Sequence, residues 1–232
     1  MQIHIPFHWT ARTHIGRCPR VFNTVFGSVN DGDRLTRENT ELVIEGFPRS
    51  GNSFSVFAFS NAGAGDLSIA HHVHSPSQII TAARYALPAV LLIRSPEDVV
   101  TAGLAKIATH RTGDLLRAYT AYYRSLLPLR EHYVIAPFET VTTDFGRVIN
   151  AVNRRFGTTF TEVDTDRHLT LSQKFLAQEK FDALQAEAPT EASDRVPQFD
   201  RYSDLMKRAE AEHARFLALA TDDGTTRPPD DA

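Results

Sequence analysis

The segment Gly46–Ser53 (GFPRSGNS) has the spacing of a phosphate-binding loop, G-x-x-x-x-G-K-[ST], with asparagine at the lysine position. Backbone N–H groups of such a loop bind phosphate oxygens, and in a nucleotide triphosphatase the lysine reaches the β and γ phosphates. Asn52 replaces that lysine, and Arg49 stands earlier in the loop. The pattern therefore favours an anion-binding loop whose ligand ends in a group other than a triphosphate.

A second anion-binding candidate is Arg94, which directly follows the apolar run Ala89–Ile93 (AVLLI). Triphosphatases usually carry an aspartate here to hold Mg²⁺, whereas an arginine repels a divalent cation and grips a further anion through its planar N–H donors. Together with the loop, Arg94 predicts a metal-independent site for two anionic groups of one ligand. A solvated arginine that caps the sheet edge is the alternative interpretation.

A third candidate loop is His71–Pro76 (HHVHSP). Neutral imidazole near pH 7 accepts a proton from an attacking hydroxyl or amine, so a histidine here suits general-base chemistry. An ordinary polar loop is the alternative. His72 and His74 would share a face on a continuing strand, but no third ligand at diagnostic spacing accompanies them, so a zinc site is disfavoured.

An alternation of strands and helices must position these three loops. Short apolar runs predict buried strands, and capping residues, prolines and apolar spacing predict the helices between them. The strands are expected at 42–44, 67–70, 89–93 and 133–135, and the helices at 52–60, 76–85, from 96 onward, at 145–157, 174–188 and 203–220. This order predicts a three-layer α/β fold of the P-loop type, with a parallel sheet flanked by helices and loops converging at the strands' carboxyl ends.

Composition sets the outer limits of the prediction. A chain of 232 residues with 42% hydrophobic content suits one domain, expected over residues 1–220, with a disordered acidic tail at 221–232. The net charge of −3 argues against a nucleic-acid partner. A single cysteine, Cys18, cannot form an internal disulfide, and neither a secretory signal nor a membrane span is apparent, so a cytoplasmic location is expected.

Two features stay open from the sequence. The sequence allows three roles for residues 1–38, which are to cover the sheet edge, to contribute to a substrate pocket or to form a dimer contact, and it does not choose among them. The oligomeric state is equally open, and a homo-oligomer is one of the options.

The segments Phe47–Phe54 (FPRSGNSF) and Leu92–Val100 (LIRSPEDVV) resemble two motifs of the sulfotransferases that use 3′-phosphoadenosine 5′-phosphosulfate. The first resembles the 5′-phosphosulfate loop, especially its arginine-bearing version in carbohydrate-type and bacterial members, and the second resembles the 3′-phosphate motif. With the histidine loop between them and Phe138-Glu139 after the fourth strand, the resemblance extends over about residues 41 to 157. It implies transfer of a sulfuryl group from this donor to a hydroxyl or amine, leaving adenosine 3′,5′-bisphosphate, without a metal.

The resemblance also implies residue roles. His74, just before the proline of the histidine loop, is the expected general base, and Arg49 is expected to stabilise charge on the transferring group and bridging oxygen. Arg94 is expected to bind the 3′-phosphate. Binding of the 5′-phosphosulfate is expected from the remaining loop residues, which are Ser50, Gly51, Asn52, Ser53 and Phe54.

Two parts of the family pattern are replaced in this chain. The family places a serine eight positions after the arginine, where this chain has Ala102, and the adjacent Thr101 is the candidate substitute. A late Arg-Lys-Gly segment is also missing, and Arg195 is the nearest candidate for its role. Glu139 is expected to structure its turn rather than to touch substrate.

Two other functions remain alternatives. A P-loop nucleotide or small-molecule kinase has the same fold but needs Mg²⁺ and ATP, against which Asn52 and Arg94 both argue. A non-catalytic nucleotide-binding module keeps the loop without turnover. For a sulfotransferase, the acceptor is expected to be a small molecule or carbohydrate that the sequence does not identify.

Overall fold

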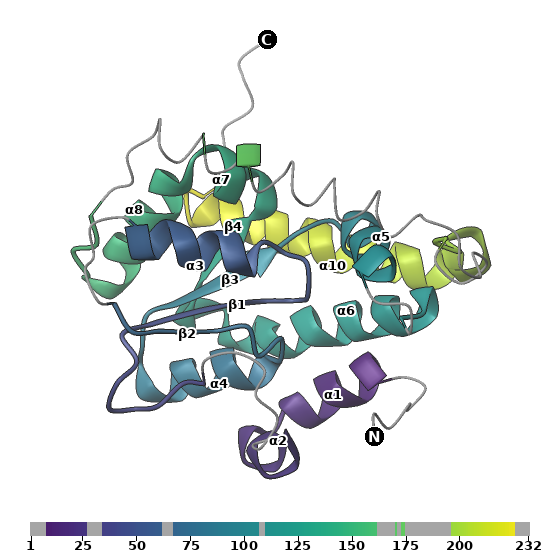
Figure 1. The fold of residues 1–232 in the computed structure, drawn as a ribbon, viewed down its shortest axis with the longest axis horizontal. Coiled ribbons are helices and arrows are strands. Elements are labelled where there is room, and N and C mark those ends of the chain that lie inside the picture. Colours follow the sequence, from purple (N-terminus) through teal and green to yellow (C-terminus); the bar gives the residue numbers. More distant parts are fainter. Residues whose placement is uncertain are drawn as a thin grey trace.

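A four-stranded parallel sheet with the order β2-β1-β3-β4 forms the centre of the molecule (Figure 1). The computed structural model describes residues 8–26, 34–61, 67–106, 110–161, 170, 173–174 and 196–225. The strands are β1 (Leu42–Gly46), β2 (Ile69–His71), β3 (Ala89–Ile93) and β4 (Val134–Pro137). All three strand pairs are parallel, which confirms the predicted α/β fold. The chain passes from β1 to β2 on one side and later to β3 on the other side of β1, so β1 marks the point where the strand order reverses. The carboxyl end of the strands at such a point is a usual place for a ligand.

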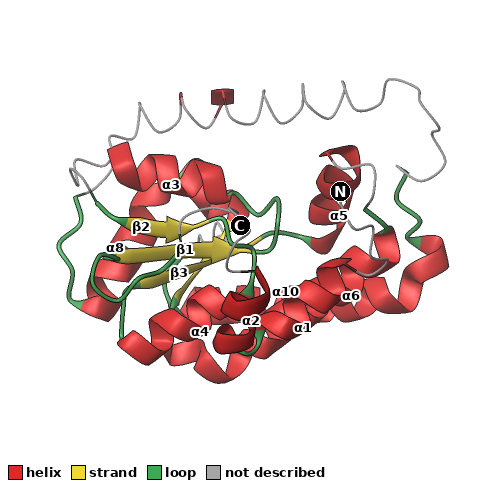
Figure 2. Cartoon of the chain, turned by 60° about the horizontal axis from the view of Figure 1, so that its bottom comes forward, coloured by secondary structure: helices red, strands yellow, loops and turns green. Residues whose placement is uncertain are grey.

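Helices cover both faces of the sheet, and alternate strand residues point to each face. Helices α3 (Asn52–Asn61) and α8 (Phe145–Phe156) share one apolar cluster with Ile44 and Leu92. Helices α4 (Pro76–Tyr85), α5 (Pro96–Lys106), α6 (Thr112–Leu126) and α10 (Ser203–Asp222) share the other cluster with Val43 and Leu91. Figure 2 shows α3 on one side of the strands and α4 on the other. Both clusters are fully buried at the strands, so each face contributes to holding the loops at the strand ends.

The helix starts predicted from Ser-Pro pairs are confirmed. Ser75 has an extended backbone and its Oγ accepts from the Ser77 N–H at 3.3 Å, with Pro76 in the first turn of α4. At the start of α5, the Asp98 N–H donates to Ser95 Oγ at 3.2 Å. These caps fix where each strand's following loop ends, and so the length of chain available to a ligand.

Four helices were not predicted from the sequence. They are α1 (His8–Gly16), α2 (Pro19–Phe26), α6 and the short α7 (Phe138–Thr143). Figure 1 shows α1 and α2 as an outer layer over α4 and α6. The Asp114 carboxylate, at the start of α6, accepts from the N–H groups of Trp9 at 3.0 Å and Thr10 at 3.1 Å. This contact satisfies the free donors at the start of α1 and fixes α1 on α6.

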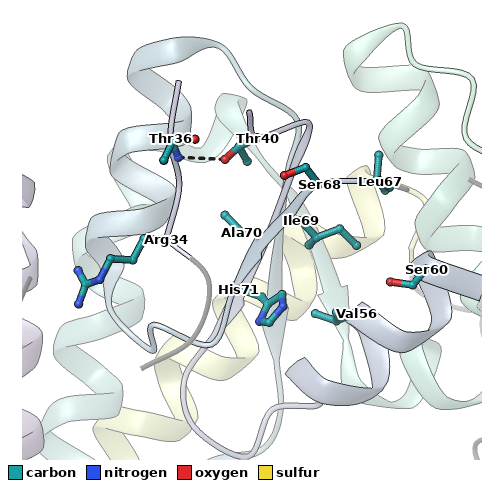
Figure 3. A pocket seen from close by; sticks show the side chains of 10 residues that line it. All are labelled: Arg34, Thr36, Thr40, Val56, Ser60, Leu67, Ser68, Ile69, Ala70 and His71. Carbon is teal, nitrogen blue, oxygen red and sulfur yellow. Dashed lines mark hydrogen bonds between the residues drawn. The ribbon is translucent and has the colours of Figure 1, made fainter. Parts of the chain in front are cut away.

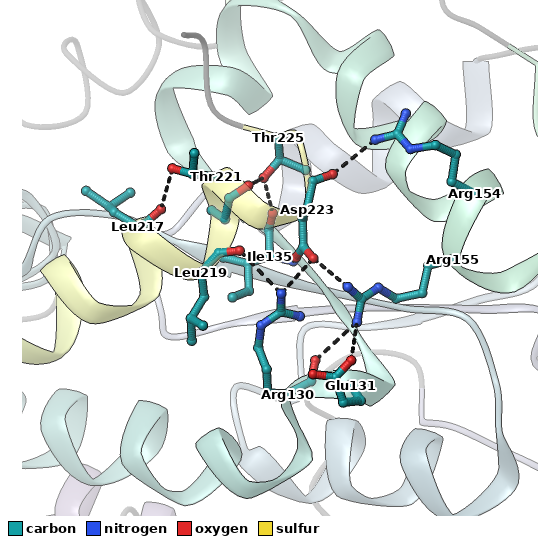
Figure 4. Close-up of polar contacts among 11 residues, drawn as sticks. Arg130, Glu131, Ile135, Arg154, Arg155, Leu217, Leu219, Thr221, Asp223 and Thr225 are labelled. Atoms are coloured by element: carbon teal, nitrogen blue, oxygen red, sulfur yellow. Dashed lines mark hydrogen bonds and ion pairs between the residues drawn. The ribbon is translucent and has the colours of Figure 1, made fainter. Parts of the chain in front are cut away.

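The C-terminal end of α10 is tied to edge strand β4 (Figure 4). Asp223 accepts from the Ile135 N–H at 3.0 Å and pairs with Arg130 at 2.9 Å and Arg155 at 2.6 Å. Thr225 donates to the Ile135 carbonyl at 2.7 Å. The prediction of a disordered tail from residue 221 is therefore wrong for residues 221–225, because the acidic composition there serves a buried ion pair. Residues 226–232 lie outside the described part of the chain.

Two further predictions fall largely on residues that are not described. Of the helix expected at 174–188, only Lys174 lies within the described ranges, and Arg195 lies outside them. Within the described ranges, no helix combines the length and the apolar character needed to cross a lipid bilayer. Cys18 is a free, exposed thiol.

Candidate functional site

The loop between β1 and α3 is shaped by two residues with positive φ. Arg49 has φ 69° and Gly51 has φ 95°, and the Ser50 N–H donates to the Phe47 carbonyl at 3.2 Å. Gly46, at the strand end, lies so close to β3 that an added Cβ would be 2.8 Å from Leu92 Cβ. The tight turn brings the free N–H groups of the first turn of α3 to the carboxyl end of the sheet, as an anion-binding loop requires.

Asn52, which occupies the lysine position of the loop, has a buried side-chain amide. Its exposed fraction is 4%, and both Nδ2 and Oδ1 lack a hydrogen-bond partner among the described residues. A buried polar group without a partner costs about 1–3 kcal/mol, so such an amide is expected where a bound ligand supplies the partner. The loop thus fits a polar ligand at the start of α3.

Arg94 lies directly beside this loop. Its Nη1 donates to the Arg49 carbonyl at 3.1 Å, and its guanidinium stacks 3.9 Å from the centre of the Phe138 ring. The Nε lies 3.7 Å from Asp98, and the side chain is only 13% exposed. A largely buried arginine is not the solvated sheet cap of the alternative interpretation. Arg49 and Arg94, which are predicted to bind one ligand, thus follow adjoining strands, and the Arg94 side chain contacts the Arg49 backbone.

Phe138, the first residue of α7 just after β4, joins the two halves of the site. A Cβ built on Gly51 would lie 3.2 Å from the Phe138 ring, and the same ring lies under Arg94. The glycine therefore allows the loop to approach the ring on which Arg94 rests. The start of α7 in this way fixes the spacing between the loop and Arg94.

Helix α6 supports the end of β3. Tyr119 donates to the Arg94 carbonyl at 2.8 Å, and Tyr123 donates to the Leu92 carbonyl at 2.9 Å. Both phenols are buried, and burial raises their pKa above the ordinary value of 10, so they remain donors at neutral pH. The Phe47 ring packs 5.6 Å from Tyr119. These tyrosines position Arg94, a role that was not predicted from the sequence.

The histidine loop is held in a strained conformation by Glu45. His72 and His74 have φ values of 58° and 50°, in the left-handed region that non-glycine residues rarely adopt. The Glu45 carboxyl accepts from the Val73 N–H at 2.6 Å and the His74 N–H at 3.0 Å, and from Gln78 Nε2 at 3.3 Å. Burial of this carboxyl raises its pKa to about 8. Glu45 thus acts as the anchor of the loop that carries the candidate base.

His74 is oriented through a hydrogen bond to the phosphate-loop backbone. Its Nδ1 lies 3.1 Å from the carbonyl of Gly46, and since a carbonyl oxygen only accepts, Nδ1 carries the proton. The neutral ring then has its lone pair on Nε2, the arrangement that a general base needs.

His72 has a different set of contacts from His74. Its Nε2 lies 2.8 Å from Ser53 Oγ and its Nδ1 lies 2.7 Å from His71 Nδ1. Both ring nitrogens of His72 are therefore occupied by protein groups, which suits a positioning role. The positive φ at both His72 and His74 shows that the chain does not continue as a strand, so the shared strand face considered for a zinc pair does not exist.

The N-terminal helix forms a wall of the site beside His74. The Trp9 ring lies 6.5 Å from the His74 ring and 6.1 Å from Phe47, measured between ring centres. Trp9 Nε1 donates to His110 Nε2 at 2.8 Å, while His110 Nδ1 lies 2.9 Å from the Gly103 carbonyl. Burial lowers the pKa of His110 to about 4, which keeps it neutral and able to accept from Trp9.

Arg12 attaches the same helix to the histidine loop. Its Nη2 donates to the Val73 carbonyl at 2.8 Å, and its side chain is buried against the rings of Phe22 and Phe26. Of the roles left open for residues 1–38, the contacts of residues 8–26 place α1 and α2 beside the site rather than at the sheet edge. Trp9, Arg12 and His110 were missed because their partners lie 61 to 101 positions away in the chain.

The remaining residues predicted to bind the donor are Phe54, Ser53, Thr101 and Arg195. The Phe54 side chain packs in the core, 6.4 Å from the Phe145 ring, so its contribution to ligand binding is limited to its backbone. Ser53 is exposed on the first turn of α3. Thr101 is exposed on α5, and Arg195 lies outside the described residues, so a role for either beside Arg94 stays a prediction.

Glu139 stands at the first turn of α7, where its carbonyl accepts from the Thr143 hydroxyl at 2.7 Å. This contact involves the backbone alone, so the role of the Glu139 side chain stays a prediction. In the part of the chain that the structure describes, no three or more histidine, cysteine, aspartate or glutamate side chains gather as a metal site would need.

Comparison with known proteins gives a similarity to a solved structure. No family model matches the chain, and no curated protein matches it. Among solved structures, the chain is similar to mouse sulfotransferase SULT7A1 complexed with PAP, with 12% sequence identity and a TM-score of 0.48. The similarity covers 85% of this chain and 92% of that one. This likeness concerns the fold, and the function of the protein has to be inferred from the geometry of its three loops.

Proposed function

We propose that this protein transfers a sulfuryl group from 3′-phosphoadenosine 5′-phosphosulfate to a hydroxyl or amine of a small-molecule or carbohydrate acceptor. The single observation that carries the proposal is the 3.1 Å contact between Arg94 and the Arg49 carbonyl. It joins a phosphate-type loop and a second, largely buried cation at adjoining strand ends. Such a pair suits a mononucleotide that carries anionic groups on both its 5′ and 3′ oxygens.

The phosphate loop and Arg94, which directly follows β3, would bind different parts of the donor. Of the loop N–H groups, that of Ser50 is used within the turn, so those of Gly51, Asn52 and Ser53 would hold the 5′-phosphate, and the ligand would supply a partner for the Asn52 amide. Arg94 would bind the 3′-phosphate through its guanidinium, held in place by Phe138 and Tyr119. A 3′-phosphate is what distinguishes this donor from AMP or ATP, so Arg94 would set donor specificity.

The transfer itself needs one base and one source of positive charge. His74 Nε2 would take the proton of the acceptor hydroxyl as its oxygen forms a bond to sulfur. The bond between sulfur and the bridging phosphate oxygen breaks in the same step, and the electron pair leaves with adenosine 3′,5′-bisphosphate. Arg49 and the loop N–H groups would stabilise the charge that develops on this leaving oxygen.

The alternatives are less well supported by the same geometry. A kinase needs a group to hold Mg²⁺ at the end of β3, where Arg94 stands instead. A non-catalytic nucleotide-binding module needs no oriented base, but Glu45 and the Gly46 carbonyl hold His74 with its lone pair on Nε2. An oriented base of this kind is not expected for a protein that only binds nucleotide.

Replacing His74 by alanine tests the proposal. The wild-type protein, the His74→Ala variant and a control, His132→Ala, which removes an exposed histidine of the segment before β4, are incubated with ³⁵S-labelled donor. The acceptors offered are p-nitrophenol, lactose and N,N′-diacetylchitobiose. We expect sulfate transfer to fall by about 10²- to 10⁴-fold in His74→Ala alone, while affinity for adenosine 3′,5′-bisphosphate is retained.

Two outcomes would count against the proposal. Unchanged transfer in His74→Ala would remove this residue from the mechanism. Wild-type protein that binds adenosine 3′,5′-bisphosphate but neither transfers nor hydrolyses the sulfuryl group would favour the non-catalytic module.

A further inference from the structure

A cavity of about 310 Å³ lies along edge strand β2 (Figure 3). Val56 and Ser60 of α3 line one side, and residues of the 34–40 segment line the other. The segment 67–70 forms its floor, and His71 lies at the carboxyl end of the strand. Because β2 is the outermost described strand, the cavity follows the side of the strand that no other described strand covers.

The His71 end of the cavity is connected to the candidate active site. His71 Nδ1 lies 2.7 Å from His72 Nδ1, and His72 Nε2 lies 2.8 Å from Ser53 Oγ. Ser53 belongs to the first turn of α3, where the donor would bind. A molecule in the cavity that touches His71 is thus two hydrogen bonds away from the phosphate loop.

The lining combines neutral hydrogen-bonding groups with an apolar floor. The hydroxyl-bearing residues are Thr36, Thr40, Ser60 and Ser68, and the apolar ones are Val56, Leu67, Ile69 and Ala70. Thr40 Oγ1 accepts from the Thr36 N–H at 3.0 Å, so its own proton remains available to an acceptor. No carboxylate is among the described residues that line the cavity.

The charge of Arg34 is directed away from the cavity. Its guanidinium donates to the Phe26 carbonyl and to Asn23, and Figure 3 shows it pointing away from His71 and Ala70. The described lining therefore has no charged group aimed at the centre of the cavity. Hydroxyl groups above an apolar floor match a sugar ring, which has hydroxyls at its rim and C–H groups on its faces.

We infer that this cavity binds the non-reacting part of a neutral carbohydrate acceptor, an inference that rests on the proposed sulfuryl transfer. Its volume lies at the low end of the about 300–1,000 Å³ usual for small-molecule sites, which suits one or two sugar rings. The reacting hydroxyl of the acceptor extends past His71 toward His74 and the loop. The cavity contributes to acceptor affinity, because it contacts the acceptor away from the atoms that react.

Filling the cavity tests the inference. Ser60→Trp places a large ring into the cavity from α3, and Phe57→Trp is the matched control, since Phe57 is an exposed residue of the same helix that does not line the cavity. The probes are lactose and N,N′-diacetylchitobiose, with p-nitrophenol as a phenolic comparison. Binding is followed by NMR shifts of the Thr40, Ile69 and Ala70 methyl groups.

We expect both disaccharides to shift these signals in the wild type and in Phe57→Trp, and to bind at least about tenfold more weakly to Ser60→Trp. Affinity for adenosine 3′,5′-bisphosphate, measured by calorimetry, should be the same in all three proteins and shows that Ser60→Trp is folded. If neither disaccharide shifts the signals, or if Ser60→Trp binds them as the wild type does, the inference is overturned. Stronger shifts with p-nitrophenol than with the sugars overturn the carbohydrate assignment as well.

The two proposals fail in different ways. Loss of the donor site would appear as absence of adenosine 3′,5′-bisphosphate binding in every variant, whatever the sugars do. Failure of the cavity assignment leaves nucleotide binding and turnover intact.

Discussion

Replacing Glu45 tests how the strained histidine loop is held. The carboxyl accepts from the N–H groups of Val73 and His74, and a buried donor left without a partner costs about 1–3 kcal/mol. Removing both acceptors with Glu45→Ala thus costs roughly 2–6 kcal/mol. The left-handed conformations of His72 and His74 cost about 1–2 kcal/mol each. The hydrogen bonds to Glu45 are thus worth about as much as the left-handed conformations cost. Without Glu45 we therefore expect the loop to relax and His74 to lose its hydrogen bond to the Gly46 carbonyl.

Glu45→Gln is the milder perturbation. The amide oxygen of glutamine can still accept from Val73, but its NH₂ group faces the His74 N–H, so one buried donor loses its partner. We expect the free energy of unfolding to fall by about 1–3 kcal/mol. Turnover should fall because the base is misplaced, whereas affinity for adenosine 3′,5′-bisphosphate should change little. Urea unfolding, kcat and NMR of the His74 ring measure the three effects.

The pH dependence of stability gives a second signature of Glu45. Burial raises its pKa in the folded protein to about 8, from 4.5. Between these values the folded state holds a proton that the unfolded state has lost. The unfolding free energy of the wild type therefore decreases as pH rises from about 4.5 to 8, and the Glu45→Gln variant lacks this component.

The control for Glu45→Gln is Glu41→Gln, just before the same strand. Glu41 is exposed and accepts one N–H group, from Ser68 at 3.0 Å. We expect it to change stability by less than about 0.5 kcal/mol, as is usual for surface positions. The account of the loop would be refuted if both variants had equal stability and pH profiles and the His74 ring signals stayed unchanged in Glu45→Gln.

Further predictions concern the supports around the site. Below its ordinary pKa of 6.5, His110 charges in the unfolded state but not in the folded one, so the wild type should lose roughly 2 kcal/mol between pH 7 and pH 5, a loss absent from His110→Gln in urea unfolding. Gly46→Ala puts a Cβ 2.8 Å from Leu92 Cβ and should cost about 1–3 kcal/mol and weaken nucleotide binding in calorimetry; a fully stable variant would contradict this packing. Asp223→Ala removes the buried carboxylate that pairs with the partly buried Arg130 and Arg155 and accepts from the Ile135 N–H, and it should cost about 3–5 kcal/mol in urea unfolding, whereas a loss below about 1 kcal/mol would show these contacts to be dispensable.

Local signals explain why the sheet and its loops could be predicted. Gly46 and Pro48 end one apolar run, and Ser-Pro pairs at 75–76 and 95–96 start the next helices, so the information lies within a few residues. The conjunction of the Arg49 loop with Arg94 followed from topology, since parallel strands bring their carboxyl ends together.

The supports of the site could not be predicted in the same way. Glu45 acts on residues 28 and 29 positions later, and Trp9 acts on His110, 101 positions later, so pairing depends on the tertiary fold. One signal was present in the sequence, because a glutamate at the end of a buried strand needs hydrogen-bond partners from elsewhere in the fold. Tyr119, Tyr122 and Tyr123 also mark α6 as a helix with a large buried face. The acidic composition of the C-terminal segment predicted disorder from residue 221, whereas Asp223 is buried and paired with two arginines.

The most direct test of the central claim is calorimetric titration with adenosine 3′,5′-bisphosphate and with AMP, both without added metal, and in a separate titration with magnesium-ATP. The proteins are the wild type, Arg94→Met and the control Arg84→Met, an exposed arginine of α4. We predict that the wild type and the control bind the bisphosphate roughly 10- to 100-fold more tightly than AMP, and that Arg94→Met loses this preference. Equal affinity of the wild type for the two nucleotides, or tighter binding of magnesium-ATP, would contradict a site built for a nucleotide phosphorylated on both sides of its ribose.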